Sequence, residues 1–178
     1  MKLLKPLQID MREFFLTGKF DCLALGQTQE WILANFPDPD WHGESAFAYR
    51  KNDIWRYGDL EFYFADGCLN MIYSDRLQNQ TDGLDGGTAL DLDAWILRVP
   101  KRLTLQNLIC ELNQNDADFE KYRSVNGWIC LYLPASKIEL CFSGENAGNP
   151  NDFLLVSFAW RERPLSGSLQ TYRNGKMR

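Results

Sequence analysis

The side chains best suited to acid–base chemistry are few and scattered. His42 is the only histidine among the 178 residues, and it follows Trp41 in a polar segment. A Ser-His-Asp triad would need a nucleophile beside it, and the chain has no Gly-x-Ser-x-Gly elbow. One histidine and five dispersed cysteines cannot build the usual zinc site. We therefore interpret His42 as an exposed loop residue, and we expect neither a metal nor another cofactor.

Two glutamates occupy matching positions in two similar segments, Glu61 within residues 60–64 and Glu139 within residues 138–142. They could act as a general acid and a general base if the two segments faced each other. Alternation with apolar neighbours instead predicts the water-exposed face of a sheet that is covered on one side. Glu61 could also pair with Arg56 across the sheet. We predict that neither glutamate is catalytic, and a small hydrolase that uses carboxylates such as Asp59 is the alternative.

Glycine-rich segments could bind calcium or phosphate, but the patterns are incomplete. The run of residues 82–87, DGLDGG, lacks the alternating ligands and the closing glutamate of an EF-hand. The chain contains no Walker A or Gly-x-Gly-x-x-Gly motif. We interpret residues 75–93 as a long polar loop, and loops of this length are often functional.

Charge and composition exclude several classes of function. The 19 basic and 24 acidic residues give a net charge of -5, which is the wrong sign for a non-specific nucleic-acid binder. No stretch approaches the roughly 20 apolar residues of a membrane span, so we expect a cytoplasmic protein with no membrane or nucleic-acid partner. The five cysteines are odd in number and form no Cys-x-x-Cys pair. Five free thiols are the prediction.

Periodicity predicts an α+β domain with an antiparallel or mixed sheet and helices on one side. Helices are expected at residues 7–16, 28–36 and 104–114, hairpins at 60–73 and 138–160, and a further strand at 95–99. Thr28 and Thr104 are the predicted N-caps. The two helix-plus-hairpin units could be a pseudo-repeat or a chance similarity. Residues 1–163 are expected to form a single domain, and residues 164–178 a frayed basic tail.

One region of the sequence has a familiar pattern. A series of short motifs lies between about residues 20 and 75, which is under a third of the chain. They are, in order, Leu25-Gly26-x-Thr28, Trp31-Ile32, Pro37, Arg56-Tyr57-Gly58-Asp59-Leu60-Glu61-Phe62-x-Phe64 and Leu69-x-x-Ile72. This pattern resembles a group of small bacterial proteins that look like the immunity proteins found beside polymorphic or contact-dependent toxins. The resemblance implies a protein that binds and occludes a toxin without catalysis. It carries no functional residue over to this chain.

A basic toxin domain would be attracted to the local acidity of this chain. Residues 54–100 contain three arginines and eight acidic residues, a net charge of -5, whereas residues 101–178 contain ten basic and eight acidic residues, a net charge of +2. We expect partner contacts from two segments, with Trp41 as the anchor: Asp38, Asp40, Trp41, Asp82, Asp85, Asp91 and Asp93. A merely solvated loop is one alternative to this interface. A small-ligand or regulatory module that uses the aromatic residues is an alternative function.

Overall fold

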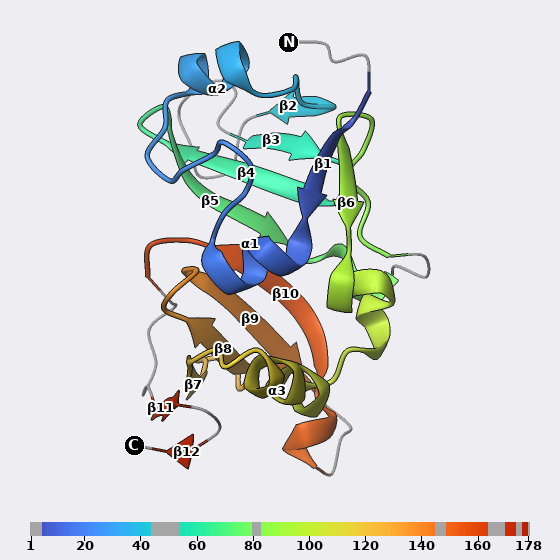
Figure 1. Cartoon of the computed structure of the whole chain (residues 1–178), viewed down its shortest axis with the longest axis vertical. Helices are drawn as coiled ribbons and strands as arrows, with labels where there is room; N and C mark the ends of the chain where they lie inside the picture. Colours follow the sequence, from blue (N-terminus) through green and yellow to red (C-terminus); the bar gives the residue numbers. More distant parts are fainter. Residues whose placement is uncertain are drawn as a thin grey trace.

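The computed structural model describes residues 5–43, 54–79, 83–144, 149–163, 170–173 and 176–177, and the statements below concern these residues. Their elements follow the chain in this order (Figure 1): β1 (Leu7–Asp10), α1 (Met11–Thr17), α2 (Gln29–Asn35), β2 (Trp41–Gly43), β3 (Ile54–Tyr57), β4 (Leu60–Ala65), β5 (Cys68–Ser74), the 3-10 helix η1 (Arg76–Asn79), β6 (Leu90–Asp93), the 3-10 helices η2 (Trp95–Arg98) and η3 (Pro100–Arg102), α3 (Leu105–Gln114), β7 (Phe119–Arg123), β8 (Ile129–Leu133), β9 (Ile138–Ser143), the 3-10 helix η4 (Pro150–Asp152), β10 (Leu154–Trp160), β11 (Gln170–Arg173) and β12 (Lys176–Met177).

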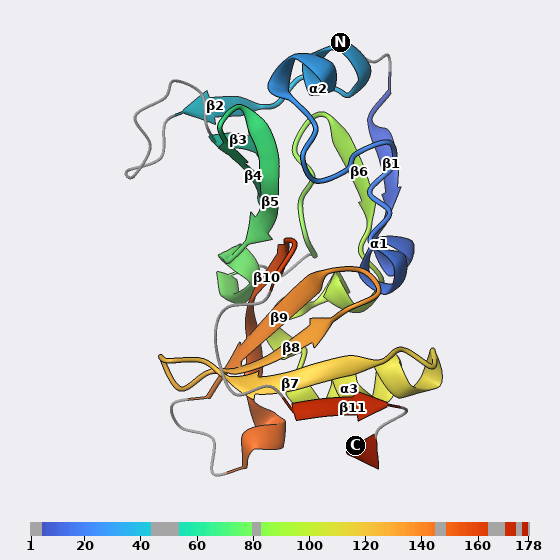
Figure 2. The ribbon, with the colours of Figure 1, turned by 90° about the vertical axis from the view of Figure 1, so that its left-hand side faces the viewer.

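A ten-stranded antiparallel sheet organises the molecule, in the order β12-β11-β7-β8-β9-β10-β5-β4-β3-β2. A small parallel sheet of β1 and β6 lies beside it, so the predicted α+β class is confirmed. Buried side chains of α1, α2 and α3 join those of one sheet face, such as Phe62 and Leu140, in one continuous core. The helices and the small sheet therefore cover the same face of the large sheet (Figures 1 and 2).

The two helix-plus-hairpin units are a true structural repeat. The first unit comprises residues 28–74 and the second unit residues 104–160. Thr28, which caps α2, forms an isolated bridge with Cys68 at the start of β5, and Thr104, which caps α3, forms the same bridge with Leu154 at the start of β10. The flanking backbone hydrogen bonds also match, since Gln29 N donates to the carbonyl of residue 67 as Leu105 N donates to that of residue 153. Both helices are thus attached to their hairpins in the same way.

The strand registers extend this repeat over eight strands of the large sheet, in which β2 to β5 correspond to β7 to β10. Phe62 pairs with Ile72, and the equivalent Leu140 pairs with Phe158. Each hairpin has a register shift at the corresponding point. In the first unit the shift lies between residues 63 and 64 of β4, and in the second unit it lies between residues 155 and 157 of β10. β5 and β10 then pair with each other, and Tyr73 lies opposite Ala159 at the centre. The units are related by a pseudo-two-fold axis at this seam between β5 and β10.

Helix α1 covers the seam on the core side (Figure 1). Its Phe14 ring lies 5.6 Å from Trp160 and its Phe15 ring lies 5.2 Å from Phe158, both in edge-to-face contact. Phe14 also contacts Phe20 at 4.8 Å, which extends the cluster into the first unit. The helix ends as predicted at Gly18, whose N–H donates to the carbonyl of Phe14.

Several predicted elements are wrong. The helix expected over residues 7–16 begins only at Met11, because Asp10 caps it by accepting a hydrogen bond from Glu13 N, and β1 pairs with β6 instead. β6 also lies within the predicted 75–93 loop. The strand predicted at residues 95–99 is a 3-10 helix, and Trp95 has a φ of 45° that no strand accommodates. Residues 170–173 do not fray, because β11 pairs with β7 through its backbone.

The prediction of five free thiols is also wrong. Cys130 and Cys141 lie directly opposite each other on β8 and β9, with their Cα atoms 4.1 Å apart, and they form a disulfide. Such closely spaced pairs occur where antiparallel neighbours do not exchange backbone hydrogen bonds, which brings their side chains together. The two cysteines are 11 residues apart in the sequence, and this spacing alone does not indicate a disulfide. Cys22, Cys68 and Cys110 are free.

Candidate functional site

The two matching glutamates do not form a catalytic pair. They lie on the face opposite Phe62 and Leu140, as alternation predicts, but both are buried, so the prediction of water-exposed side chains is wrong. The predicted pairing with Arg56 is confirmed, since its guanidinium lies 2.7 Å from Glu61. Arg161 forms the corresponding ion pair with Glu139. Two strands separate the carboxylates, which corresponds to about 14 Å at the usual strand spacing, whereas acid–base pairs need roughly 5–9.5 Å.

Asp40, a predicted partner contact, joins two segments of the first unit. Its carboxylate accepts hydrogen bonds from Gly58 N at 2.9 Å, from Thr88 N at 3.0 Å and from the Thr88 hydroxyl. Partial burial alone would raise the pKa of Asp40, but these hydrogen bonds outweigh it and hold the pKa below its ordinary value. The two segments predicted to share an interface are therefore adjacent, and Asp40 has a structural role in holding them together.

The Tyr-Gly-Asp-Leu-Glu segment is structural as well. The buried Tyr57 hydroxyl donates to the carbonyl of Pro37 at 2.8 Å. Asp59 accepts a hydrogen bond from Asp85 N at 2.9 Å, and its own N–H donates to the carbonyl of Asp85 at 2.8 Å. Gly58, between them, has a φ of 57°, and a Cβ there would clash with the backbone of residues 85 and 87. Asp85 thus belongs to the anchored part of its loop.

The other predicted contacts are dispersed. Asp91 and Asp93 are exposed on β6, where Gln8 donates to Asp91 at 3.2 Å and Arg98 lies 3.9 Å from Asp93. Trp41 is 48% exposed, and the guanidinium of Arg56 lies 5.0 Å from the centre of its ring. Asp82 falls outside the described residues. The acidic side chains therefore extend from the α2–β2 linker to β6 and do not converge on one point.

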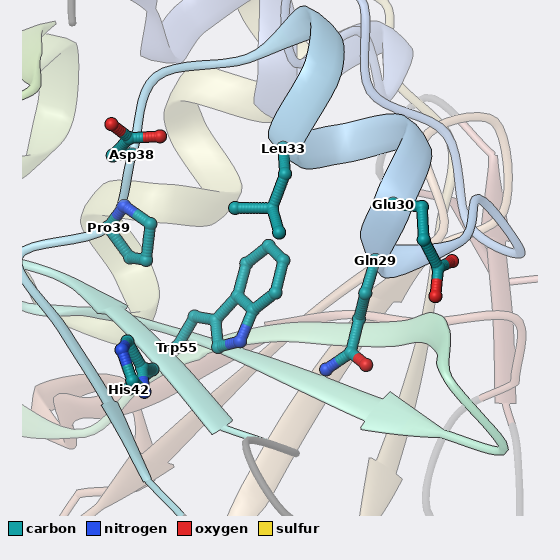
Figure 3. Close-up of a pocket in the computed structure, with 7 residues that line it drawn as sticks. All are labelled: Gln29, Glu30, Leu33, Asp38, Pro39, His42 and Trp55. Atoms are coloured by element: carbon teal, nitrogen blue, oxygen red, sulfur yellow. The ribbon is translucent and has the colours of Figure 1, made fainter. Parts of the chain in front are cut away.

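A hollow of about 410 Å³ lies between α2 and strands β2 and β3. We call it the α2–β3 hollow, and Figure 3 shows its described lining: Gln29, Glu30, Leu33, Asp38, Pro39, His42 and Trp55. Trp55 lies in the middle, with Leu33 above it and His42 and Gln29 on either side. Glu30 and Asp38 stand on opposite sides of the ring. The arrangement is an apolar floor between two carboxylates.

Local sequence explains how each lining residue reaches the hollow. The Thr28 cap starts α2, so that residues 29, 30 and 33 share one helix face while Ile32 enters the core. His42 pairs with Trp55 in register on β2 and β3, which places both side chains on the face below α2. The sequence analysis identified Asp38 and considered His42, but it missed Trp55. An aromatic residue on an amphipathic strand gives no sign that one edge of its ring borders a hollow.

The second structural unit provides an internal comparison for the hollow. The caps and registers make Gln29 equivalent to Leu105, and Trp55 equivalent to Leu131. Leu105 and Leu131 are both completely buried. The corresponding space in the second unit is thus lined by packed apolar side chains, whereas in the first unit it is open and polar. The hollow is therefore a departure from the shared architecture.

The described side chains of the hollow are of types that can bind a ligand. Its described lining includes no serine, threonine or cysteine that could serve as a nucleophile. No group of three or more metal-binding side chains gathers anywhere in the part of the chain that the structure describes. Two carboxylates around an indole can instead attract a cation and cover its apolar portion.

Comparison of the chain with models of protein families, with curated proteins and with solved structures found no match. Within the described ranges, no helix has the length and apolar character needed to cross a membrane.

Proposed function

We propose that this protein is a non-catalytic, immunity-type protein that neutralises a basic bacterial toxin by covering it. The observation that carries the proposal is the α2–β3 hollow, an open recess whose described lining includes Glu30, Asp38 and Trp55. Protein interfaces concentrate their binding energy in such pockets, which take up a few large or charged anchors. The exposed Trp41 and Leu33 add apolar surface on the neighbouring elements.

Three features support binding over catalysis. Glu61 and Glu139 are each neutralised by an arginine and are far apart. The carboxylate of Asp59 accepts a hydrogen bond from the backbone N–H of Asp85. The described lining of the hollow includes acidic groups and no serine, threonine or cysteine. These contacts argue against the small hydrolase that the carboxylates suggested.

The test is binding of the toxin domain encoded beside the gene for this protein. We expect a one-to-one complex, inhibition of the toxin at equal concentration, and weaker binding by the double variant Glu30→Gln/Asp38→Asn. The variant Asp116→Asn/Asp152→Asn removes the same charge from exposed positions of the second unit and should bind normally. No complex, or equal loss in both variants, contradicts the proposal.

A small-ligand or regulatory module is the second candidate, because about 410 Å³ lies within the range of small-molecule pockets. A low-molecular-weight ligand retained through purification, in the absence of any toxin complex, would favour it.

The proposal includes action in the cytoplasm. Because the cytosol keeps cysteines reduced, all five thiols should be found when intact cells are quenched in acid and the protein is then alkylated in denaturant. A Cys130–Cys141 pair that is already oxidised in cells would contradict the cytoplasmic placement.

A further inference from the structure

We propose that Cys130 and Cys141 form a reversible redox pair, and that the buried hydroxyl of Tyr122 shifts the balance of this pair towards the dithiol. The pair closes to a disulfide by reaction with a low-molecular-weight disulfide such as oxidised glutathione. The inference rests on the proposed function only for its cytoplasmic setting, where disulfides are usually transient and redox-sensing.

The first observation is the register of the strands. Cys130 on β8 lies directly opposite Cys141 on β9 in the antiparallel ladder. Cross-strand neighbours of this kind have their side chains close together on the same face of the sheet. Backbone pairing therefore keeps the two sulfurs within reach of each other whether or not the bond between them exists.

The second observation is that the fold does not commit the pair strongly to either state. The disulfide joins cysteines only 11 positions apart, and closing so short a loop stabilises a protein modestly. Folding favours the disulfide over the dithiol by the same free energy by which the disulfide stabilises the fold, so this preference is modest too. The other three cysteines are free, and two of them, Cys22 and Cys110, are exposed, as is usual in reducing surroundings.

The third observation is the hydroxyl of Tyr122. This residue lies opposite Cys130 on β7, and both belong to one buried cluster with Cys141 and Tyr132. Tyr122 is 3% exposed, and in the part of the chain that the structure describes its hydroxyl has no hydrogen-bond partner. A buried hydroxyl without a partner destabilises the state in which it occurs.

Reduction supplies the missing partner. A disulfide has no proton to donate, whereas the thiol of Cys130 is a weak donor and acceptor. Two bonded sulfurs lie closer than van der Waals contact, so breaking the bond separates them. Because β8 lies between β7 and β9, the Cys130 sulfur moves away from Cys141 and towards Tyr122. The hydroxyl of Tyr122 therefore favours the dithiol over the disulfide.

The reaction consumes one molecule of oxidised glutathione and releases two of reduced glutathione. The thiolate of Cys141, which is 4% exposed against 0% for Cys130, attacks one glutathione sulfur and breaks the glutathione disulfide. The thiolate of Cys130 then attacks the Cys141 sulfur of this mixed disulfide and displaces the second glutathione. The two thiol protons pass to the two glutathione thiolates, and two electrons pass from the protein to glutathione. Because both residues are buried, the exchange needs local opening of the sheet and is slow.

The test is equilibration of the whole protein with reduced and oxidised glutathione in graded ratios, from separate oxidised and reduced samples, followed by acid quenching, alkylation in denaturant and mass spectrometry. Trypsin cleaves after Lys137 and so places Cys130 and Cys141 in separate peptides that only the disulfide joins. We expect the bridged fraction to change across the series and the two starting samples to converge. A pair that stays fully oxidised or fully reduced throughout would overturn the inference.

Two variants test the part played by Tyr122. Tyr122→Phe removes the hydroxyl that lacks a partner beside the disulfide, and it should shift the equilibrium towards the disulfide by about fivefold. Tyr132→Phe is the matched control, because the hydroxyl of Tyr132 donates to the carbonyl of Glu162 at 3.2 Å, a bond that does not involve the sulfurs. The control should shift the equilibrium by less than about twofold. Equal shifts in both variants, or none for Tyr122→Phe, would overturn the role of Tyr122.

The outcome is separate from that of the toxin-binding experiment. A reversible titration without any toxin complex would sustain the inference while contradicting the proposed function. A toxin complex formed by a protein whose cysteine pair does not titrate would do the reverse.

Discussion

Asp40 and Asp91 show how differently two aspartates of the same acidic region behave. Asp40 accepts three hydrogen bonds from Gly58 and Thr88, whereas Asp91 is exposed and accepts one from Gln8 at 3.2 Å. Sequence reasoning gave both the same role as partner contacts. Only the fold distinguishes them, because the groups that bond Asp40 come from positions 18 and 48 residues away.

The first prediction concerns the stability supplied by Asp40. Asp40→Asn should lower the free energy of unfolding by about 1–2 kcal/mol, because the amide replaces one acceptor oxygen by a donor. Asp91→Asn should change it by less than about 0.5 kcal/mol. Urea unfolding of both variants at pH 7 measures the difference, and equal effects would contradict the assignment.

The second prediction is the pH dependence of that difference. The pKa of Asp40 is lowered in the folded protein, so its contribution is present above the unfolded-state pKa of aspartate, about 3.9. The contribution is lost as the pH falls through the lower, folded-state value. The stability gap between the native protein and Asp40→Asn should therefore narrow in acid below about pH 4. A gap that stays constant down to pH 2 would show that the carboxylate charge is not involved.

At the scale of elements, the two equivalent helices differ in how firmly they are held. Thr28 accepts a hydrogen bond from Trp31 N at 3.2 Å. Thr104 accepts one from Asn107 N at 3.1 Å, and the side chain of Asn107 accepts one in return from Thr104 N at 3.3 Å. α3 has 10 residues and buries three leucines, whereas α2 has 7 residues and buries Ile32. The helix beside the hollow is the less firmly anchored one.

The third prediction follows from these caps. Thr28→Ala should cost about 1 kcal/mol and Thr104→Ala up to about 2 kcal/mol, because the Thr104 hydroxyl both accepts a hydrogen bond from Asn107 N and donates one to Asn107 Oδ1. Thr28→Ser and Thr104→Ser keep the acceptor and should lie close to the native protein. The measurement is thermal or urea unfolding of the four variants. A larger loss for Thr28→Ala than for Thr104→Ala would contradict the comparison.

The disulfide between β8 and β9 supplies the fourth prediction. After purification and oxidation in air, the protein denatured without reductant should show three titratable thiols, those of Cys22, Cys68 and Cys110, and five after reduction. Replacing Cys130 and Cys141 together by alanine should cost about 2–3 kcal/mol, which is the expected effect of opening a loop closed over 11 positions. Five thiols in the oxidised protein, or no change in stability, would contradict the pairing.

How far the elements could be predicted depended on the range of the interactions that form them. The hairpin at Asp66-Gly67 and the caps at Thr28 and Thr104 are local, and the structure confirms all three. β1, β6 and β11 form through backbone pairing with partners far along the chain. Their four residues each are too few to indicate a strand, even where apolar and polar residues alternate strictly, as in β6. The hollow was missed for the same reason, since α2 and β3 meet there only after folding.

At the scale of the whole molecule, charge is distributed unevenly along the chain. The net charge is -5 over residues 54–100 and +2 over residues 101–178. Neither the total charge nor the pI of about 4.9 describes this local concentration of negative charge.

The fifth prediction concerns the negative charge of residues 54–100. Association with a basic toxin domain should slow by about tenfold or more between 50 mM and 500 mM salt. Asp91→Asn/Asp93→Asn should associate more slowly at low salt and show a shallower salt dependence. The control Asp116→Asn/Asp152→Asn changes the same number of exposed charges in the second unit and should resemble the native protein. Stopped-flow rates that do not respond to salt would exclude electrostatic steering.

The seam between β5 and β10 also matters while the chain is being made. Tyr73 and Ala159 are 86 residues apart in sequence, and at about 5–20 residues per second the ribosome needs about 4–17 s to synthesise the second partner after the first. During that interval β5 has an unpaired edge, and Phe14 and Phe15 lack the rings of Trp160 and Phe158. Each nascent chain therefore passes through a stage in which only β2 to β5, four strands of the ten-stranded sheet, have been made, and the free edge of β5 is open to chaperones or to a neighbouring chain on the same polysome.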